Sequence, residues 1–166
     1  MEEIRIRKGN MRDADALSQI EAECFPAAEA ADRNTIFYRL SVYPDHFLIL
    51  EKDGEIVSFI NGFCTDEKDL QDEMYEKADM HDENGKWQMI FGLDTKPDCQ
   101  KHGYAGMVLN ALIHLAEEEG RKGLVLTCKT HMIPYYEKFG FVNEGVSESV
   151  HGNVVWYQMR REFSHE

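Results

Sequence analysis

Positive charge is scarce in this sequence. It contains 18 lysine and arginine residues against 31 aspartate and glutamate residues, which gives a formal net charge of −13 at pH 7. Because nucleic-acid binding depends on lysine and arginine at the phosphates, this composition disfavours that class of protein, and we expect no nucleic-acid partner. An acidic surface is compatible with a cationic small molecule, and it also serves simple solubility.

Long apolar segments are also missing. No apolar run approaches the roughly 20 residues that a membrane-spanning helix needs. The first residues, MEEIRIRKGNMRDAD, lack the apolar core of a secretion signal. We therefore expect a cytoplasmic protein with no membrane partner.

Cysteines are few and scattered. They form neither a Cys-x-x-Cys pair nor a spacing with histidine that is typical of zinc. In a reducing compartment we expect such thiols to be buried or incidental, with no metal and no disulfide. The four are Cys24, Cys64, Cys99 and Cys128.

Internal boundaries are absent as well. The chain has no repeat, no low-complexity tract and no linker rich in proline, glycine or serine, and its 43% hydrophobic content is ordinary for a globular protein. Its 166 residues suffice for one domain with a real core and are few for two. We expect a single domain over residues 1–166.

Periodicity and turn signals outline a mixed α/β protein. Strands are predicted at 4–8, 46–52, 55–63, 87–95, 123–129, 141–145 and 153–161. Helices are predicted at 14–25, 34–43, 107–120 and 131–139, and the acidic segment 67–85 is expected to be a solvated partial helix plus loop. Asp53-Gly54 predicts a tight hairpin turn.

The region 87–129 reads as strand, helix, strand. Such a unit forms a right-handed crossover, so its two strands should be parallel. The helix has one apolar face and is ended by Gly120. The face consists of Leu109, Leu112, Ile113 and Ala116. The other strands should be antiparallel, which gives a mixed sheet.

The short loop QKHGYA (100–105) lies at the start of that helix. A helix start presents unpaired N–H groups and the positive end of the helix dipole, and Gly103 allows a close approach of the backbone. Together these features form an anion site, although ordinary turn chemistry also explains them. No G-x-x-x-x-G-K-[ST] loop and no G-x-G-x-x-G fingerprint is present.

Two motifs carry a family resemblance. Gln100-x-x-Gly103-x-Ala105, which follows LDTKPDCQ, fits a pyrophosphate loop of the form (Arg/Gln)-x-x-Gly-x-(Gly/Ala). A second signature, PYYEKFGF (134–141), follows after an intervening strand. This combination resembles the GNAT N-acetyltransferase superfamily. The stretches IEAECFP, FINGFCTDEKDL, LTCK and GVSESVHGNVVWYQM are similar to the arylalkylamine (serotonin-type) N-acetyltransferases and their microbial relatives.

The resemblance implies a fold and a reaction. The fold is a mixed, mostly antiparallel sheet of about six or seven strands with one central parallel pair, flanked by about four or five helices. The reaction is transfer of an acetyl group from acetyl-CoA by direct attack of a small primary amine, arylalkylamine or polyamine-like, without an acetyl-enzyme.

Residues for acetyl-CoA follow from the same resemblance. Backbone N–H groups of the loop would bind the pyrophosphate, and the end of the preceding strand would pair with the pantetheine arm. The implied set is Leu93, Asp94, Thr95, Gln100, Lys101, His102, Gly103, Tyr104, Ala105 and Gly106. Gly92 inside that strand suggests either a bulge that frees an oxyanion donor or a packing glycine.

Tyr136 is the expected general acid. The family places this hydroxyl near the thioester sulfur, where it can donate a proton to the departing thiolate. Tyr135 beside it is better explained by packing in a short amphipathic helix.

The proton acceptor is less defined. An alkylamine is only about one part in two thousand neutral at pH 7, so a base is needed. The paired histidines of the vertebrate enzymes align with Met89 and Phe91, which do not titrate. Glu29 is the first candidate, and a solvated loop acid is its alternative. His131 and His151 follow, and an ordinary surface or hydrogen-bonded role is the alternative for each of them.

The acceptor pocket is predicted from aromatic residues. Phe25 and Pro26 align with a substrate-facing segment, and Trp156 with an aromatic wall. Such rings could stack on an aryl group or hold an ammonium by a cation–π contact, or they could belong to the core.

Three functions remain open at this point. The first is the small-amine N-acetyltransferase. The second is a GNAT enzyme that acts on a protein N-terminus, a lysine or an antibiotic. The third is an acyl-CoA-binding module without turnover, which the missing histidine pair allows and Tyr136 disfavours. The sequence does not decide between a monomer and a homodimer.

Overall fold

A computed structural model describes residues 3–164. These residues form two compact units. The N-terminal unit contains the chain up to Gly62 together with Gly92–Leu112, and the C-terminal unit contains Phe63–Phe91 and the chain from Ile113 onward. The expected single domain over residues 1–166 stays a prediction.

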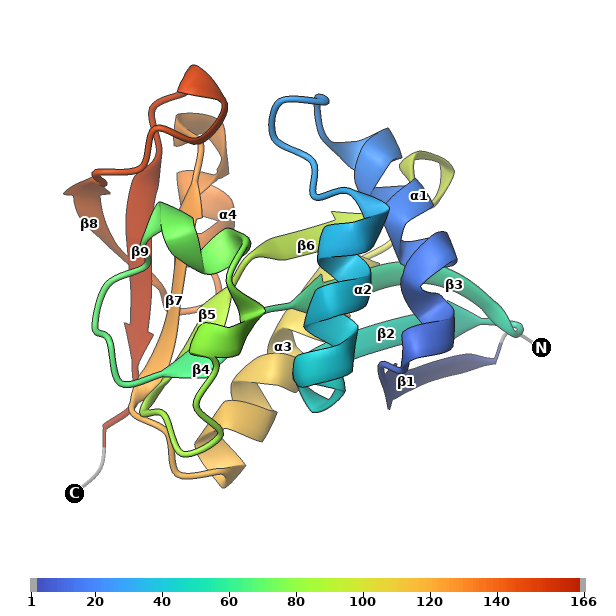
Figure 1. The fold of residues 1–166 in the computed structure, drawn as a ribbon, viewed down its shortest axis with the longest axis horizontal. Helices are drawn as coiled ribbons and strands as arrows, with labels where there is room; N and C mark the ends of the chain where they lie inside the picture. The colour runs from blue at the N-terminus through green and yellow to red at the C-terminus, as the bar shows by residue number, and fades with distance from the viewer. Residues whose placement is uncertain (1–2, 165–166) are drawn as a thin grey trace. The chain divides into compact units, whose positions relative to one another are not determined.

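The fold is the expected mixed α/β fold, mostly antiparallel with one parallel pair. The described residues form four α-helices, α1 Ala14–Cys24, α2 Arg33–Val42, α3 Tyr104–Glu118 and α4 Ile133–Glu137 (Figure 1). They form nine strands: β1 Ile4–Lys8, β2 Phe47–Lys52, β3 Glu55–Asn61, β4 Cys64–Thr65, β5 Trp87–Ile90, β6 Gly92–Thr95, β7 Gly123–Cys128, β8 Val142–Val146 and β9 Tyr157–Glu162. The strands lie in two sheets.

The N-terminal unit contains an antiparallel sheet with the order β1-β2-β3-β6. The turn between β2 and β3 is Asp53-Gly54, and both residues have positive φ, 52° and 84°. A tight hairpin turn with two positive φ angles matches the right-handed twist of the strands and suits this dipeptide. The predicted hairpin is therefore confirmed.

Two helices lie side by side on one face of this sheet (Figure 1). A capping box at Asn10 and Asp13 satisfies backbone donors just before α1. Leu17 and Ile20 of α1 are buried, as the periodicity predicts. Cys24 on the same face is half-buried, and its Sγ donates to the carbonyl of Thr95 in β6 at 3.1 Å. These contacts attach α1 to β6.

The C-terminal unit contains the sheet β4-β5-β7-β9-β8. The pair β5–β7 is parallel, with Trp87 opposite Gly123 and Ile90 opposite Leu126, and the other pairs are antiparallel. The parallel pair predicted from 87–129 is thus confirmed.

Helix α3 joins the two strands of that crossover. The four residues of its predicted apolar face, Leu109, Leu112, Ile113 and Ala116, are all buried. Gly120 follows the helix with φ of 79°, the left-handed conformation that favours glycine after a helix end. No helix within residues 3–164 is both long and apolar enough to cross a membrane.

Segment 87–95 differs from the expected single strand. It breaks at Phe91 into β5 and β6, which belong to different sheets. The break agrees with the irregularity suggested by Gly92, and it is one reason why the strands number nine in two sheets rather than six or seven in one.

Segment 67–85 is not a solvated helix. It forms only 3-10 turns at Asp72–Tyr75 and Ala78–Met80. Leu70 and Met74 are buried, and the backbone N–H of Leu70 donates to the side chain of Gln158 on β9. The N–H of Leu70 thus bonds to β9 and not within a helix.

Candidate active site

The loop at the start of α3 has the backbone geometry of an anion cradle. Lys101 and Gly103 have positive φ angles of 68° and 84°, and both are exposed. The carbonyl of Gly103 accepts a hydrogen bond from the N–H of Met107, so helical bonding begins here. The N–H groups before Met107 have no intrahelical partner by geometry, and the helix dipole adds positive potential.

The other loop residues leave this surface open. Gln100 and His102 are exposed, Ala105 and Gly106 are half-buried, and Tyr104 is buried. A Cβ atom at Gly103 would meet no atom within 4 Å, so the glycine is explained by its positive φ and not by crowding. The side-chain amide of Gln100 donates to the carbonyl of Thr95 at 3.3 Å, which connects the loop to the end of β6.

β6 lies at the edge of the N-terminal sheet. Its neighbour there is β3, with Ser58 opposite Thr95 and Ile60 opposite Leu93. Leu93 is half-buried, and the Thr95 hydroxyl lies 2.9 Å from that of Ser58. An edge strand offers backbone groups to an extended ligand, as β-strand addition requires.

The side chain of Asp94 faces away from solvent and is 1% exposed. Burial first, and then the charge of Glu21, raises the pKa of Asp94 well above its ordinary value. Because the side chain is buried, the predicted contact of Asp94 with acetyl-CoA could involve only its backbone.

Tyr136 is buried in the short helix α4 of the C-terminal unit. Its ring contacts Tyr135 and Phe141 edge-on, with centroids 5.3 and 6.0 Å apart. Tyr135 is half-buried and packs on Phe139 at 5.2 Å, and burial raises its pKa. Packing thus holds the Tyr136 ring in place.

Gly140 ends the Tyr136 segment. Its φ is 87°, and a Cβ atom there would lie 3.0 Å from Nε of Arg161. That Nε donates to the carbonyl of Phe139 at 2.9 Å. The glycine of PYYEKFGF therefore has both a conformational and a steric reason.

The candidate residues around the end of α1 lie in the N-terminal unit. Phe25 follows α1 and is half-buried, and Pro26 is exposed. Glu29 is half-buried in the turn that Pro26 begins, where its N–H donates to the Pro26 carbonyl at 2.8 Å.

Four rings of the C-terminal unit form a continuous aromatic array, defined as Phe91, Tyr75, His151 and Trp156. Phe91 lies 5.0 Å from Tyr75, Tyr75 stacks on His151 at 5.2 Å and 6°, and His151 lies 6.1 Å from Trp156. All four are half-buried, and Nζ of Lys129 lies 5.7 Å from the Trp156 ring. The array can offer ring faces to an aryl or cationic group.

The array includes positions that sequence reasoning treated differently. Tyr75 was missed because it lies in the acidic segment expected to be solvated, and its Oη lies 3.1 Å from the hydroxyl of Thr127. Met89 is fully buried, whereas Phe91 belongs to the array. His131 is exposed and does not belong to the array as defined above.

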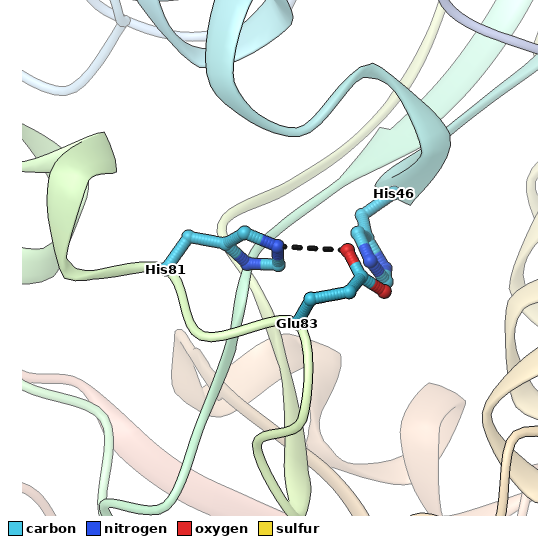
Figure 2. A group of neighbouring side chains, drawn as sticks. All are labelled: His46, His81 and Glu83. Atoms are coloured by element: carbon cyan, nitrogen blue, oxygen red, sulfur yellow. Dashed lines mark hydrogen bonds and ion pairs between the residues drawn. The ribbon is translucent and has the colours of Figure 1, made fainter.

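A further histidine of this unit, His81, has a structural environment (Figure 2). Its Nδ1 accepts from the backbone N–H of Cys64 at 3.1 Å, so Nε2 carries the hydrogen toward Glu83 at 3.0 Å. Glu83 also pairs with the buried Arg121 at 3.2 Å. This network stabilises the loop before β5.

Comparisons with known proteins agree with this geometry. Residues 14–141 match the Acetyltransferase (GNAT) family. The chain is 25% identical over 153 residues to a serotonin N-acetyltransferase of Mesocricetus auratus, which covers 90% of this chain and 72% of that protein.

Solved structures share the fold. The loading GNATL domain of CurA from Lyngbya majuscula has a TM-score of 0.83 at 15% identity, covering 96% of this chain and 98% of that one. The ribosomal-protein-S18-alanine N-acetyltransferase from Escherichia coli has a TM-score of 0.73 at 17% identity, covering 99% and 96%. Because the family match extends over most of the sequence, the chain belongs to the acetyltransferase (GNAT) family and is an acyltransferase with acetyl-CoA as its co-substrate.

Proposed function

We propose that this protein acetylates a small primary amine, arylalkylamine or polyamine-like, by direct attack of the amine on acetyl-CoA. The observation that carries the proposal is the QKHGYA loop, in which the exposed residues Lys101 and Gly103 have positive φ angles at the start of a 15-residue helix. Similarity to a serotonin N-acetyltransferase supports an amine as acceptor.

Residues 100–106 bind the pyrophosphate in this proposal. The backbone N–H groups of Lys101 to Gly106 supply the hydrogen bonds, and the α3 dipole favours the negative charge. The edge of β6 at Leu93 and Thr95 pairs with the pantetheine arm, because its backbone lies at the end of the N-terminal sheet.

Tyr136 is the proposed general acid. The neutral amine nitrogen attacks the thioester carbonyl carbon, the carbon–sulfur bond breaks, and the departing thiolate takes the tyrosine proton. The nitrogen loses a proton as the amide forms, and that proton returns to the tyrosine through solvent. Free CoA thiol and an N-acetylated amine are the products. The buried ring suits this role because its packing against Phe141 restricts the positions that the side chain can take.

Glu29 is the proposed base. It lies in a loop, half-buried, three residues after Pro26, where a carboxylate can receive the proton of an incoming ammonium. His151 is second, because its ring is stacked on Tyr75 within the aromatic array. Phe25, Pro26 and Trp156 are the proposed acceptor-binding residues, and cation–π attraction to Trp156 suits an ammonium.

A thiol-release screen tests the proposal. Purified protein is mixed with acetyl-CoA and phenethylamine, tryptamine or a polyamine, and free CoA thiol is measured. We expect release with at least one amine and a matching N-acetyl product by mass spectrometry. CoA binding without release across a broad amine panel would sink the proposal and favour a non-catalytic acyl-CoA-binding module.

A protein N-terminus is the second candidate acceptor. The fold shared with the ribosomal-protein-S18-alanine N-acetyltransferase favours it. Short peptides with different N-terminal residues, assayed beside the amines, separate the two: peptide-dependent release with no amine-dependent release would replace the small-amine proposal.

A further inference from the structure

Polar side chains gather inside the N-terminal unit around Gly92. Glu21 on α1, Arg39 on α2, Asn61 on β3 and Asp94 on β6 are 6%, 3%, 1% and 1% exposed. A Cβ atom at Gly92 would lie 3.1 Å from Oδ1 of Asp94, 3.3 Å from Nδ2 of Asn61 and 3.5 Å from Oε1 of Glu21. Three elements thus bring polar atoms to the small space that glycine leaves at the start of β6.

Three of these four groups have defined partners. Nη1 of Arg39 donates to Oδ1 of Asn61 at 3.0 Å, and Oε2 of Glu21 accepts from the N–H of Ala31 at 2.9 Å. In the described part of the chain, neither carboxylate oxygen of Asp94 has a hydrogen-bond partner. An unpaired, fully buried carboxylate is costly, so Asp94 requires another explanation.

A proton supplies that explanation. Two carboxylates only accept hydrogen bonds, so Asp94 and Glu21 can bond to each other only when one of them is protonated. With both ionised, the cluster with Arg39 has a net charge of −1, and with one proton it is neutral. Burial and the charge of Glu21 raise the pKa of Asp94, whereas Arg39 lowers it. Both the missing partner of Asp94 and the direction of this pKa shift favour a protonated pair.

We propose that Glu21 and Asp94 share one proton and that this bond positions the start of β6 for acyl transfer. Both are positioning residues, since they act through the backbone at Gly92 and Leu93. The inference rests on the proposed function, in which β6 receives the pantetheine arm. The bond ties α1 to β6, in addition to the contact of Cys24 with Thr95.

The proposal predicts that stability and activity decline as pH rises. The groups that face Asp94 are Glu21 and Cys24 from α1, Arg39 from α2 and Asn61 from β3. Burial raises the pKa of Cys24, which favours its neutral thiol. Because the folded-state pKa of Asp94 is raised, its contribution to stability is full below the unfolded value of 3.8 and is lost as pH rises through the folded value.

D94N is the main test. The asparagine amide can donate to Glu21 without a titrating proton, and Arg39 then balances the one remaining carboxylate. We measure kcat with the best amine of the screen from pH 6 to 10 for both proteins. The ratio of D94N to wild type cancels the ionisation of the amine. We expect it to rise about tenfold per pH unit above the folded-state pKa of Asp94. A ratio that stays constant over this range, together with melting temperatures of the two proteins that fall in parallel, would overturn the proposal.

Thermal melting separates this inference from the proposed function. We expect the wild-type melting temperature to fall with rising pH more steeply than that of D94N, whether or not any amine is acetylated. Parallel melting curves would overturn the shared proton by themselves. E23Q, on an exposed position of α1, is the matched control and should melt like wild type at every pH.

Two more variants distinguish positioning from simple packing. D94A removes the bond, so kcat should fall at least about tenfold at pH 7 and be restored in D94N. If D94A does not fold, E21Q takes its place: its amide donates to an ionised Asp94, and the alkaline decline should vanish as in D94N. An E21Q protein that declines in parallel with wild type would contradict the proposal.

Discussion

The two units contribute to the proposed reaction in different chemical forms. The N-terminal unit offers main chain: a loop with positive φ at Lys101 and Gly103, and the edge of β6. The C-terminal unit offers side chains: the packed hydroxyl-bearing ring of Tyr136 and the aromatic array. Donor binding should therefore respond to changes of backbone shape, whereas chemistry and acceptor binding should respond to the loss of single groups.

The strongest test of this division is Y136F. Loss of the proposed general acid should lower kcat by about 10²- to 10⁴-fold, because the thiolate must leave without a proton. The KM for acetyl-CoA should not change, since the loop and β6 are untouched. Steady-state kinetics at several acetyl-CoA concentrations measure both values.

Y135F is the matched control for that variant. Tyr135 is adjacent and half-buried, and it packs on Phe139, so removing its hydroxyl should leave kcat near wild type. Equal losses in both variants would mean that Tyr136 acts through packing, and the C-terminal unit would then supply no acid.

Glu29 lies outside this division, because it belongs to the N-terminal unit, as do the proposed acceptor-binding residues Phe25 and Pro26. E29Q should lower kcat/KM by about 10²-fold at pH 7 if it accepts the proton of the amine. The loss should shrink as pH approaches the amine pKa of about 10, where the neutral amine needs no base. A pH–rate profile measures this.

A loss that is the same at every pH would assign Glu29 to substrate binding rather than to proton transfer. No loss at all would move the base to His151 or to water. E23Q again serves as the control, because that carboxylate is exposed on α1.

A change in the backbone of the QKHGYA loop should affect only the binding of acetyl-CoA. G103A places a Cβ on a residue with φ of 84°, which costs about 1 kcal/mol unless the loop shifts. A shifted loop misaligns its N–H groups, so the Kd for CoA should rise by about tenfold, while kcat at saturating acetyl-CoA stays close to wild type.

G120A is the matched control at the other end of α3. Its φ is 79°, and as at Gly103 a Cβ atom would meet nothing within 4 Å. Both variants should lose similar stability in denaturant unfolding, but only G103A should weaken CoA binding in calorimetry. Weakened binding in both would indicate a general effect of the helix.

Much of the fold could be predicted from the sequence because its signals are local. The Asp53-Gly54 turn, the apolar face of α3 and the parallel pair follow from short-range patterns. The break at Phe91 could not, since WQMIFGLDT reads as one continuous apolar strand and the two halves separate only by joining different sheets.

The rest depends on contacts between distant residues. Glu21 and Asp94 are individually ordinary acids in the sequence, and only the packing of α1 on β6 makes them a buried pair. Tyr75 lies in an acidic segment in which Leu70 bonds to Gln158 of β9, so its place in the aromatic array had no local signal.

The smallest expected effect concerns the aromatic array. W156L keeps an apolar side chain but removes the ring face, and a cation–π contact at a partly exposed site contributes about 0.5–1 kcal/mol. The KM for an arylalkylamine or polyamine should therefore rise about two- to fivefold, with kcat and the KM for acetyl-CoA unchanged.

K129M is the control, since it keeps the Trp156 ring and removes the cation 5.7 Å from it, and it should not raise the amine KM. A W156L protein with wild-type KM for every amine would place Trp156 in the core of the C-terminal unit and leave acceptor binding to Phe25 and Pro26. The side-chain role of the C-terminal unit would then be reduced to Tyr136.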